Sequence, residues 1–161
     1  MGWLIVTALV LASFLDIEHN IGRLPARIPT HFDFSGLADR WGPRNSLWVT
    51  LAVQVLTCAL ILLIPLLARW RPNLAHFGSH RLSDFSPEQQ QRVLPMFKQM
   101  TAYLSILIAF GFHLLIHERM HAAAEPQHRL PVGWLLTILL VAPLALVAYY
   151  LPRVSRIAKG D

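Results

Sequence analysis

The sequence predicts an all-α fold, a polytopic membrane protein made of a bundle of four transmembrane helices. A structured extracytoplasmic loop is expected between the first and second helices. The composition supports this, because 55% of the residues are hydrophobic and 14% are charged, against about a quarter charged in soluble domains. The mean hydropathy is +0.46, and the apolar residues are gathered in four blocks. At 161 residues, the chain has room for one domain.

Each of the four apolar blocks is close to the length that a membrane span requires, about 20 residues. We expect a single membrane domain over 1–161, with spans at about 2–18, 47–68, 96–117 and 132–151. They would be joined by an outward loop, 19–46, and a cytoplasmic loop, 69–95. No Lys or Arg precedes the first block, and Ala12-Ser13-Phe14 is a poor cleavage site. An uncleaved first helix is therefore favoured over a signal peptide.

The positive charges border the apolar blocks. The net charge is +5, but the arginines do not cluster on an amphipathic surface with interleaved aromatic residues, which argues against a nucleic-acid partner. The middle loop and the tail together carry more Lys and Arg than the other two loops, which places both termini in the cytoplasm. Cys58 is the only cysteine, so no disulfide can form within the chain.

Two proline-containing segments carry helix signals. Ser86 can cap a helix whose first residue is Pro87, and Gln89 can close the capping box. This helix is expected to continue into the third span. In the fourth span, Pro143 leaves one carbonyl without its usual donor, and we expect neighbouring helices to satisfy it.

The outward loop contains residues that restrict its backbone. Pro25 and Pro29 fix two backbone angles and favour extended conformations before them, whereas Gly36 permits a tight turn. Apolar side chains in such a loop need to be buried. The sequence therefore predicts a rigid extended segment laid over the outer end of the helices.

The loop also carries a motif with fixed spacing. It reads Leu24-Pro25, Ile28-Pro29, His31-Phe32, Gly36, Asp39 and Trp41, with Arg44 following. This pattern, LPxxIPxHFxxxGxxDxW, resembles the short N-terminal domain of unknown function of SdpI-like bacteriocin-immunity membrane proteins. In that family the motif follows the first span and leads into the second, as it does here. The resemblance implies an immunity-like role in the bacterial inner (plasma) membrane.

Two interpretations of the loop remain open. It could bind an external peptide or protein partner, because loops fixed on a rigid scaffold often carry function. Alternatively, its polar groups could serve only the loop's own backbone. The candidate binding residues are Pro25, Pro29, His31, Phe32, Gly36, Asp39, Trp41 and Arg44.

A second candidate site lies at the outward end of the third span. His113, His117 and His121 are spaced four apart and share one helix face. His117 to His121 also matches H-E-x-x-H, in which two histidines bind zinc and the glutamate, here Glu118, acts as general base. Arg119 is a charge inside the motif, which is unusual for such proteases. Structural histidines, a zinc or copper site without catalysis, peptide hydrolysis and proton sensing all remain possible interpretations.

Three functions follow from these candidates. The favoured one is an integral membrane binding or regulatory protein that recognises a peptide or protein through its outward loop and has no enzymatic activity. The second is an accessory subunit of a larger membrane complex. The third is a zinc-dependent membrane metallopeptidase with Glu118 as its base.

Metal content separates these alternatives. If the histidine face is a metal site, protein purified in mild detergent should hold zinc or copper at close to one ion per chain. Elemental analysis should then show this metal lost in the His117→Ala/His121→Ala variant. Equal and negligible metal in both proteins would remove the metallopeptidase hypothesis.

Overall fold

A computed structural model describes residues 2–77, 80–125 and 127–159, and these residues are mostly helical. Four helical segments are long and apolar enough to cross a membrane, as expected for a multi-pass membrane protein. They are α1 (Gly2–Asn20), α2 (Ser46–Trp70), α3 (Pro87–Ala124) and the segment Val132–Ile157. The last segment is made of α4 (Val132–Leu136), the π-helical turn η3 (Thr137–Val141) and most of α5 (Ala142–Lys159).

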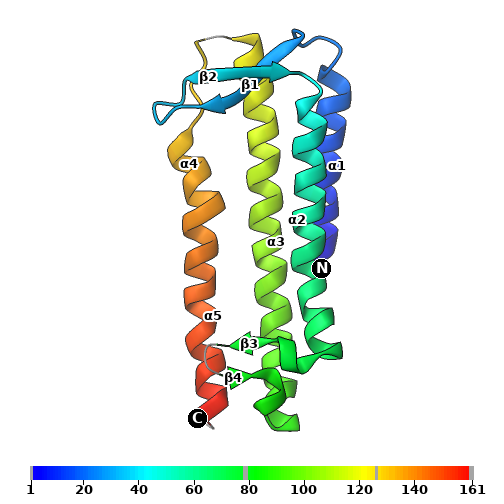
Figure 1. The fold of residues 1–161 in the computed structure, drawn as a ribbon, viewed down its shortest axis with the longest axis vertical. Helices are drawn as coiled ribbons and strands as arrows, with labels where there is room; N and C mark the ends of the chain where they lie inside the picture. Colours follow the sequence, from blue (N-terminus) through cyan, green and yellow to red (C-terminus); the bar gives the residue numbers. More distant parts are fainter. Residues whose placement is uncertain (1, 78–79, 126, 160–161) are drawn as a thin grey trace.

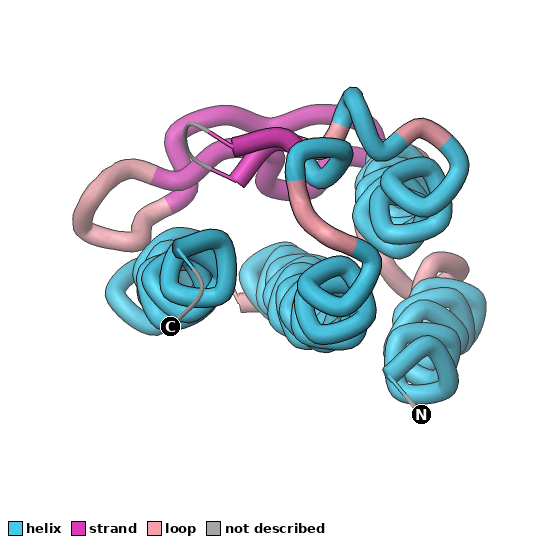
Figure 2. The backbone as a smooth tube through the Cα atoms, turned by 90° about the horizontal axis from the view of Figure 1, so that it is seen from below, coloured by secondary structure: helices cyan, strands magenta, loops and turns pink. Residues whose placement is uncertain are grey.

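The third helix holds the others together. α3 packs against α1 and α2 on one side and against α5 on the other, and α5 has no comparable contact with α1 or α2 (Figure 2). Only 6% of the apolar window of the fourth segment is buried, compared with 28% for α3. In Figure 1, the C-terminus lies at the lower end of the helices, and the N-terminus lies higher, at the lower tip of the shorter α1. The fourth segment therefore leaves most of its surface to its surroundings.

Polar side chains join α2 to α3 in the middle of the helices. The Gln54 side-chain amide donates to the Ala109 carbonyl at 2.8 Å, and the Ser105 hydroxyl donates to the Cys58 carbonyl at 3.5 Å. Gln54 is fully buried, and its Oε1 has no hydrogen-bond partner among the described residues. Such bonds contribute to helix association where apolar burial contributes little.

The fourth segment changes its helical geometry directly before Pro143. In the π-helical turn η3, the Ala142 N–H donates to the Thr137 carbonyl five residues earlier. Local π adjustments of this kind accommodate a proline that lacks an N–H. The turn lies against Gly111 of α3, where a Cβ atom would overlap the Leu139 side chain. Help from neighbouring helices for the carbonyl freed by Pro143 stays a prediction.

The predicted start of α3 is confirmed. Gln89 N–H donates to the Ser86 hydroxyl, and Ser86 N–H donates to the Gln89 side chain, which completes the capping box. α3 has 38 residues, so it is about 57 Å long and exceeds the roughly 30 Å hydrocarbon core. In the segment 69–95, expected as a cytoplasmic loop, residues 69–70 therefore belong to α2 and residues 87–95 to α3.

The remaining connector between α2 and α3 is folded onto the helices. It contains the short 3₁₀ turns η1 (Pro72–Leu74) and η2 (Leu82–Asp84) and two paired strands, β3 (His76–Phe77) and β4 (His80–Arg81). An apolar cluster fixes it to the helices: Ala68, Phe77, Leu82, Phe85, Val93 and Val154.

A second hairpin lies across the opposite end of the helices (Figure 1). Its strands β1 (Arg27–Phe32) and β2 (Ala38–Pro43) are antiparallel, with Arg27 opposite Pro43 and Phe32 opposite Ala38. The all-α prediction therefore does not hold in this segment, where the predicted extended loop forms two paired strands. The chain reverses because Gly36 adopts a positive φ of 83°, a conformation that suits glycine.

Candidate functional site

The turn between β1 and β2 is organised by one carboxylate. Asp33 Oδ1 accepts hydrogen bonds from the Ser35 N–H and hydroxyl and from the Leu37 N–H, at 2.7–3.0 Å. The Ser35 hydroxyl, and then the Leu37 N–H, lower the pKa of Asp33 below its usual value. Asp33 is therefore ionised near neutral pH and holds the turn in one shape.

The turn is also attached to the segment that leads into α4. The Leu130 N–H donates to the Gly36 carbonyl at 2.8 Å. A Cβ atom at Gly36 would overlap the Leu130 carbonyl oxygen, so this close approach requires glycine. The tip of the hairpin is consequently held against the fourth segment.

The middle of the hairpin is attached to the helices by Arg119. Its Nε donates to the Pro29 carbonyl at 2.9 Å, Nη1 to the Thr50 hydroxyl at 2.6 Å and Nη2 to the Ser46 hydroxyl at 2.7 Å. The side chain is buried, with 5% of its surface exposed. Among the described residues it forms no ion pair. One guanidinium group from α3 therefore joins β1 to the start of α2.

Our sequence reasoning missed this anchor, because it treated Arg119 only as a departure from a protease motif. A usable signal was present. Ser46 and Thr50 are four residues apart on one face of α2, at the same end of the helices as Arg119 of α3. Hydroxyl groups at this spacing can accept two bonds from a single guanidinium group.

The base of the hairpin is fixed by further bonds and by apolar packing. Arg44 donates to the Leu24 carbonyl at 3.0 Å, and Arg27 donates to the Trp41 carbonyl at 3.0 Å. Leu24 and Ile28 are buried in a cluster with residues of α1, α2 and α3. Arg44 thus bonds the loop's own backbone, as the second of the two interpretations of the loop would have it.

A cavity of about 520 Å³ lies between the hairpin and the fourth segment. The hairpin contributes Thr30, His31, Phe32, Asp33, Phe34 and Asp39 to its lining. Its opposite wall is apolar: Leu115, Leu130, Val132, Leu135, Leu136 and Leu139. Three of the eight predicted binding residues, His31, Phe32 and Asp39, thus line the cavity. The other five do not line it: Pro25, Pro29, Gly36, Trp41 and Arg44.

The rim of this cavity is polar. The His31 Nδ1 and Asp39 Oδ1 atoms are 2.6 Å apart and link the two strands. Asp39 Oδ2 and Asp33 Oδ2 take part in no hydrogen bond within the described parts of the chain. Next to them, the Phe34 side chain is 99% exposed. The rim therefore offers two acceptor oxygens beside an exposed aromatic ring.

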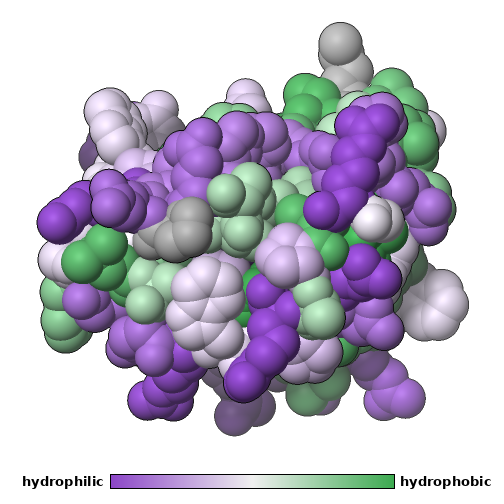
Figure 3. Space-filling model, turned by 90° about the horizontal axis from the view of Figure 1, so that it is seen from above, coloured by the Kyte–Doolittle hydropathy of each residue, from purple (hydrophilic) through white to green (hydrophobic). Residues whose placement is uncertain are grey.

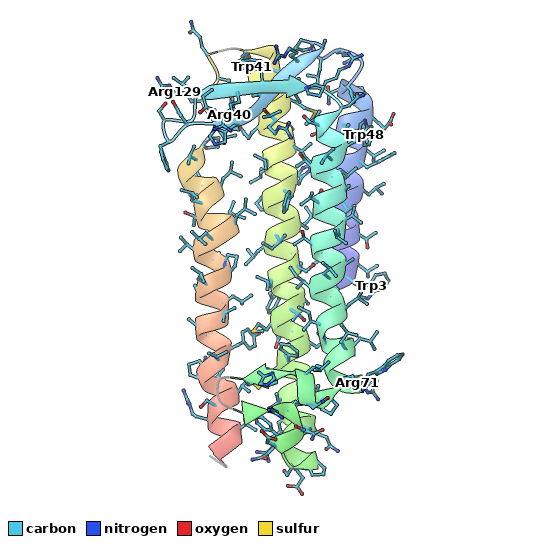
Figure 4. All side chains as sticks on the ribbon, in the orientation of Figure 1. Trp3, Arg40, Trp41, Trp48, Arg71 and Arg129 are labelled. Atoms are coloured by element: carbon cyan, nitrogen blue, oxygen red, sulfur yellow. The ribbon has the colours of Figure 1, made fainter. Side chains whose placement is uncertain are left out.

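The end of the molecule that carries this hairpin is largely hydrophilic (Figure 3). Trp41, Arg40 and Arg129 lie around the hairpin in Figure 4. Arg129 also donates a long hydrogen bond, 3.5 Å, to the Ser35 carbonyl.

The histidines of α3 pair mainly with α1. The His113 Nδ1 lies 3.1 Å from the Ser13 hydroxyl, and the His117 Nδ1 lies 3.0 Å from Asp16 Oδ2. The two pairs are one helical turn apart, and their order along both helices shows that α1 and α3 run parallel. They also bring polar groups into the contact between two apolar helices.

His121 and His128 extend the row of polar side chains formed by His113 and His117. The His121 ring lies between His117 and His128, with ring centroids 4.6 and 5.9 Å away. His128 Nε2 bonds Glu118 Oε2 at 2.7 Å. His117 and His121 line a second cavity of about 280 Å³, together with Asp16 and Arg23.

The described residues contain no group of three or more His, Cys, Asp or Glu side chains placed to hold a metal ion. His113 and His117 each have a separate partner on α1, and Glu118 holds His128. The metal site at His113, His117 and His121, and the base role of Glu118, stay predictions.

Comparison with known proteins agrees with the predicted domain of unknown function. Residues 4–55 match a domain of unknown function, DUF1648, which here includes α1, the β1–β2 hairpin and the start of α2. Over 140 residues the chain is 27% identical to an uncharacterized protein of Archaeoglobus fulgidus. The alignment covers 83% of this chain and 76% of that protein. No solved structure matches the chain. Membership of the immunity family stays a prediction.

Replacing the buried anchor should loosen the hairpin. Arg119→Met keeps most of the side-chain volume but loses all three hydrogen bonds, so we expect a loss of about 2–3 kcal/mol in stability. Thermal unfolding in detergent measures this loss, and trypsin cleavage after Arg40 should become faster. Arg129→Met is the matched control, because its bond is long and exposed. An Arg119→Met protein as stable and protease-resistant as the parent would contradict the anchor role.

Proposed function

We propose that the chain is an integral membrane binding or regulatory protein that recognises a peptide or protein partner through the β1–β2 hairpin. The observation that carries this proposal is the apolar cavity of about 520 Å³ beneath a hairpin that is fastened to the helices. Arg119 fixes β1, and Leu130 fixes the turn.

The chemistry of the cavity indicates what it would bind. Its leucine wall suits an apolar side chain, and Asp33 Oδ2 and Asp39 Oδ2 suit N–H donors of a bound backbone or a cationic side chain. The exposed Phe34 ring adds an aromatic contact at the rim. Because the hairpin is already fixed, binding would cost little conformational entropy on this side of the complex.

We propose that the protein acts by occupancy, as its resemblance to immunity proteins implies, and not by hydrolysis. We place it in the bacterial inner membrane, with the hairpin outward and both termini in the cytoplasm. The excess of Lys and Arg in the middle connector and the tail supports this orientation.

The orientation can be tested by cysteine labelling in a Cys58→Ser background. Phe34→Cys and Leu74→Cys place thiols at opposite ends of the helices, where the native side chains are 99% and 70% exposed. A membrane-impermeant maleimide should label position 34 in intact cells and position 74 only after permeabilisation. The reverse pattern would show that the hairpin faces the cytoplasm.

The binding role can be tested by photo-crosslinking in living cells. Benzoylphenylalanine at position 34 should give a discrete peptide or protein adduct on gels and by mass spectrometry, and the same group at position 74 should not. The adduct should weaken at least about fivefold when His31→Ala and Asp39→Ala are added, the scale expected for losing one or two polar contacts. Glu118→Gln should leave it unchanged. Only lipid adducts at position 34, or none, would contradict a peptide or protein partner.

A second candidate function, an accessory subunit, is favoured by the small buried share of the fourth segment. Leu144 is 61% exposed on this segment. Crosslinking from position 144 to another membrane protein, without an adduct at position 34, would favour the accessory role. An adduct at position 34 alone would favour the hairpin.

A further inference from the structure

The end of the helices opposite the hairpin contains another cavity, of about 370 Å³, enclosed by α1, α2 and α3. It is formed where α1 begins, where α2 ends and where α3 enters the apolar region. The start of α1 lies close to α3, since a Cβ atom at Gly2 would sit 2.8 Å from the Ala102 Cβ. This cavity has no contact with the hairpin, so it is independent of the proposed binding function.

Two cations line this cavity, Arg69 from the last turn of α2 and Lys98 from α3. Within the described residues, neither side chain forms a hydrogen bond or an ion pair. No carboxylate contributes to the lining. The Thr101 hydroxyl, which also lines it, is already used for the Phe97 and Lys98 carbonyls. The two positive charges therefore face the cavity without a protein partner.

The other walls are apolar. Leu62 and Leu66 are one turn apart on α2 and lead from Arg69 into the apolar region. Trp3 of α1 is 60% exposed at the edge of the cavity. In Figure 4, Trp3 lies near the N-terminus and Arg71 at the end of α2, both away from the hairpin. Tryptophan and basic residues at span ends are typical of the level of the lipid headgroups.

We propose that this cavity binds the phosphate headgroup of an anionic phospholipid, with its acyl chains along Leu62 and Leu66. Two unpaired cations complement a phosphate, and basic pockets between spans are known to bind such headgroups. A zwitterionic lipid would fit less well, because the described lining offers no carboxylate to pair with its ammonium group. A soluble anion would not use the apolar wall below the cations. A phospholipid uses both parts of the cavity.

The test is native mass spectrometry of the purified full chain in mild detergent, titrated with phosphatidylglycerol, phosphatidylcholine or glycerol phosphate. We expect one saturable phosphatidylglycerol adduct, bound at least about tenfold more tightly than phosphatidylcholine, since each basic residue near an anionic headgroup contributes severalfold. Glycerol phosphate should not displace it. Displacement by glycerol phosphate would identify a soluble-anion site and overturn the proposal.

Paired variants locate the site. Arg69→Gln/Lys98→Gln should lower the affinity for phosphatidylglycerol by roughly tenfold or more. Arg71→Gln/Arg92→Gln removes the same charge from the same end but outside the cavity, and should change the affinity less than about twofold. Equal losses in both variants would show a general charge effect and overturn the proposal, as would equal binding of the two lipids. Both variants are surface changes, and their thermal unfolding in the absence of lipid verifies that they fold.

Discussion

The arrangement of the hairpin end depends on one buried guanidinium group, which has no counter-charge among the described residues. Arg119 donates its three hydrogen bonds to neutral oxygens, those of Pro29, Ser46 and Thr50. A buried cation is costly unless its donors are bonded, so these acceptors must stay in place together. They belong to β1 and α2, and the arginine belongs to α3. The hairpin is thereby positioned against the helices, and the cavity beneath it has a defined shape.

The sequence was sufficient for the helices and insufficient for the hairpin. Apolar blocks of spanning length and the Ser86–Gln89 capping box are local signals, and both were interpreted correctly. The pairing of β1 with β2 is local, but the position of the hairpin on the helices depends on contacts distant in sequence, between Gly36 and Leu130 and between Pro29 and Arg119. The two prolines of the loop indicated extended backbone, which is compatible with paired and with unpaired segments. Prolines restrict backbone angles, but they do not determine which strand lies opposite.

The same limit applies to the candidate site. Spacing correctly placed His113, His117 and His121 on one face of α3, but it carried no information about what that face would meet. It meets Ser13 and Asp16 of α1, so two of the histidines are engaged in contacts between helices. His31 and Asp39 were chosen from the motif and do lie together. The leucines of the opposite wall come from the fourth segment, and a motif confined to the first half of the chain could not reveal them.

The bond between Gly36 and Leu130 has a consequence for biogenesis. The chain is synthesised from its N-terminus, so the hairpin emerges long before the residue that fastens its tip. Until α3 has been inserted, Arg119 is also missing, and the Pro29 carbonyl has no partner from the helices. Before α3 and the fourth segment are made, the hairpin therefore has only its own bonds and its packing against α1 and α2. Its position on the helices becomes complete only when the residues around Leu130 have been synthesised.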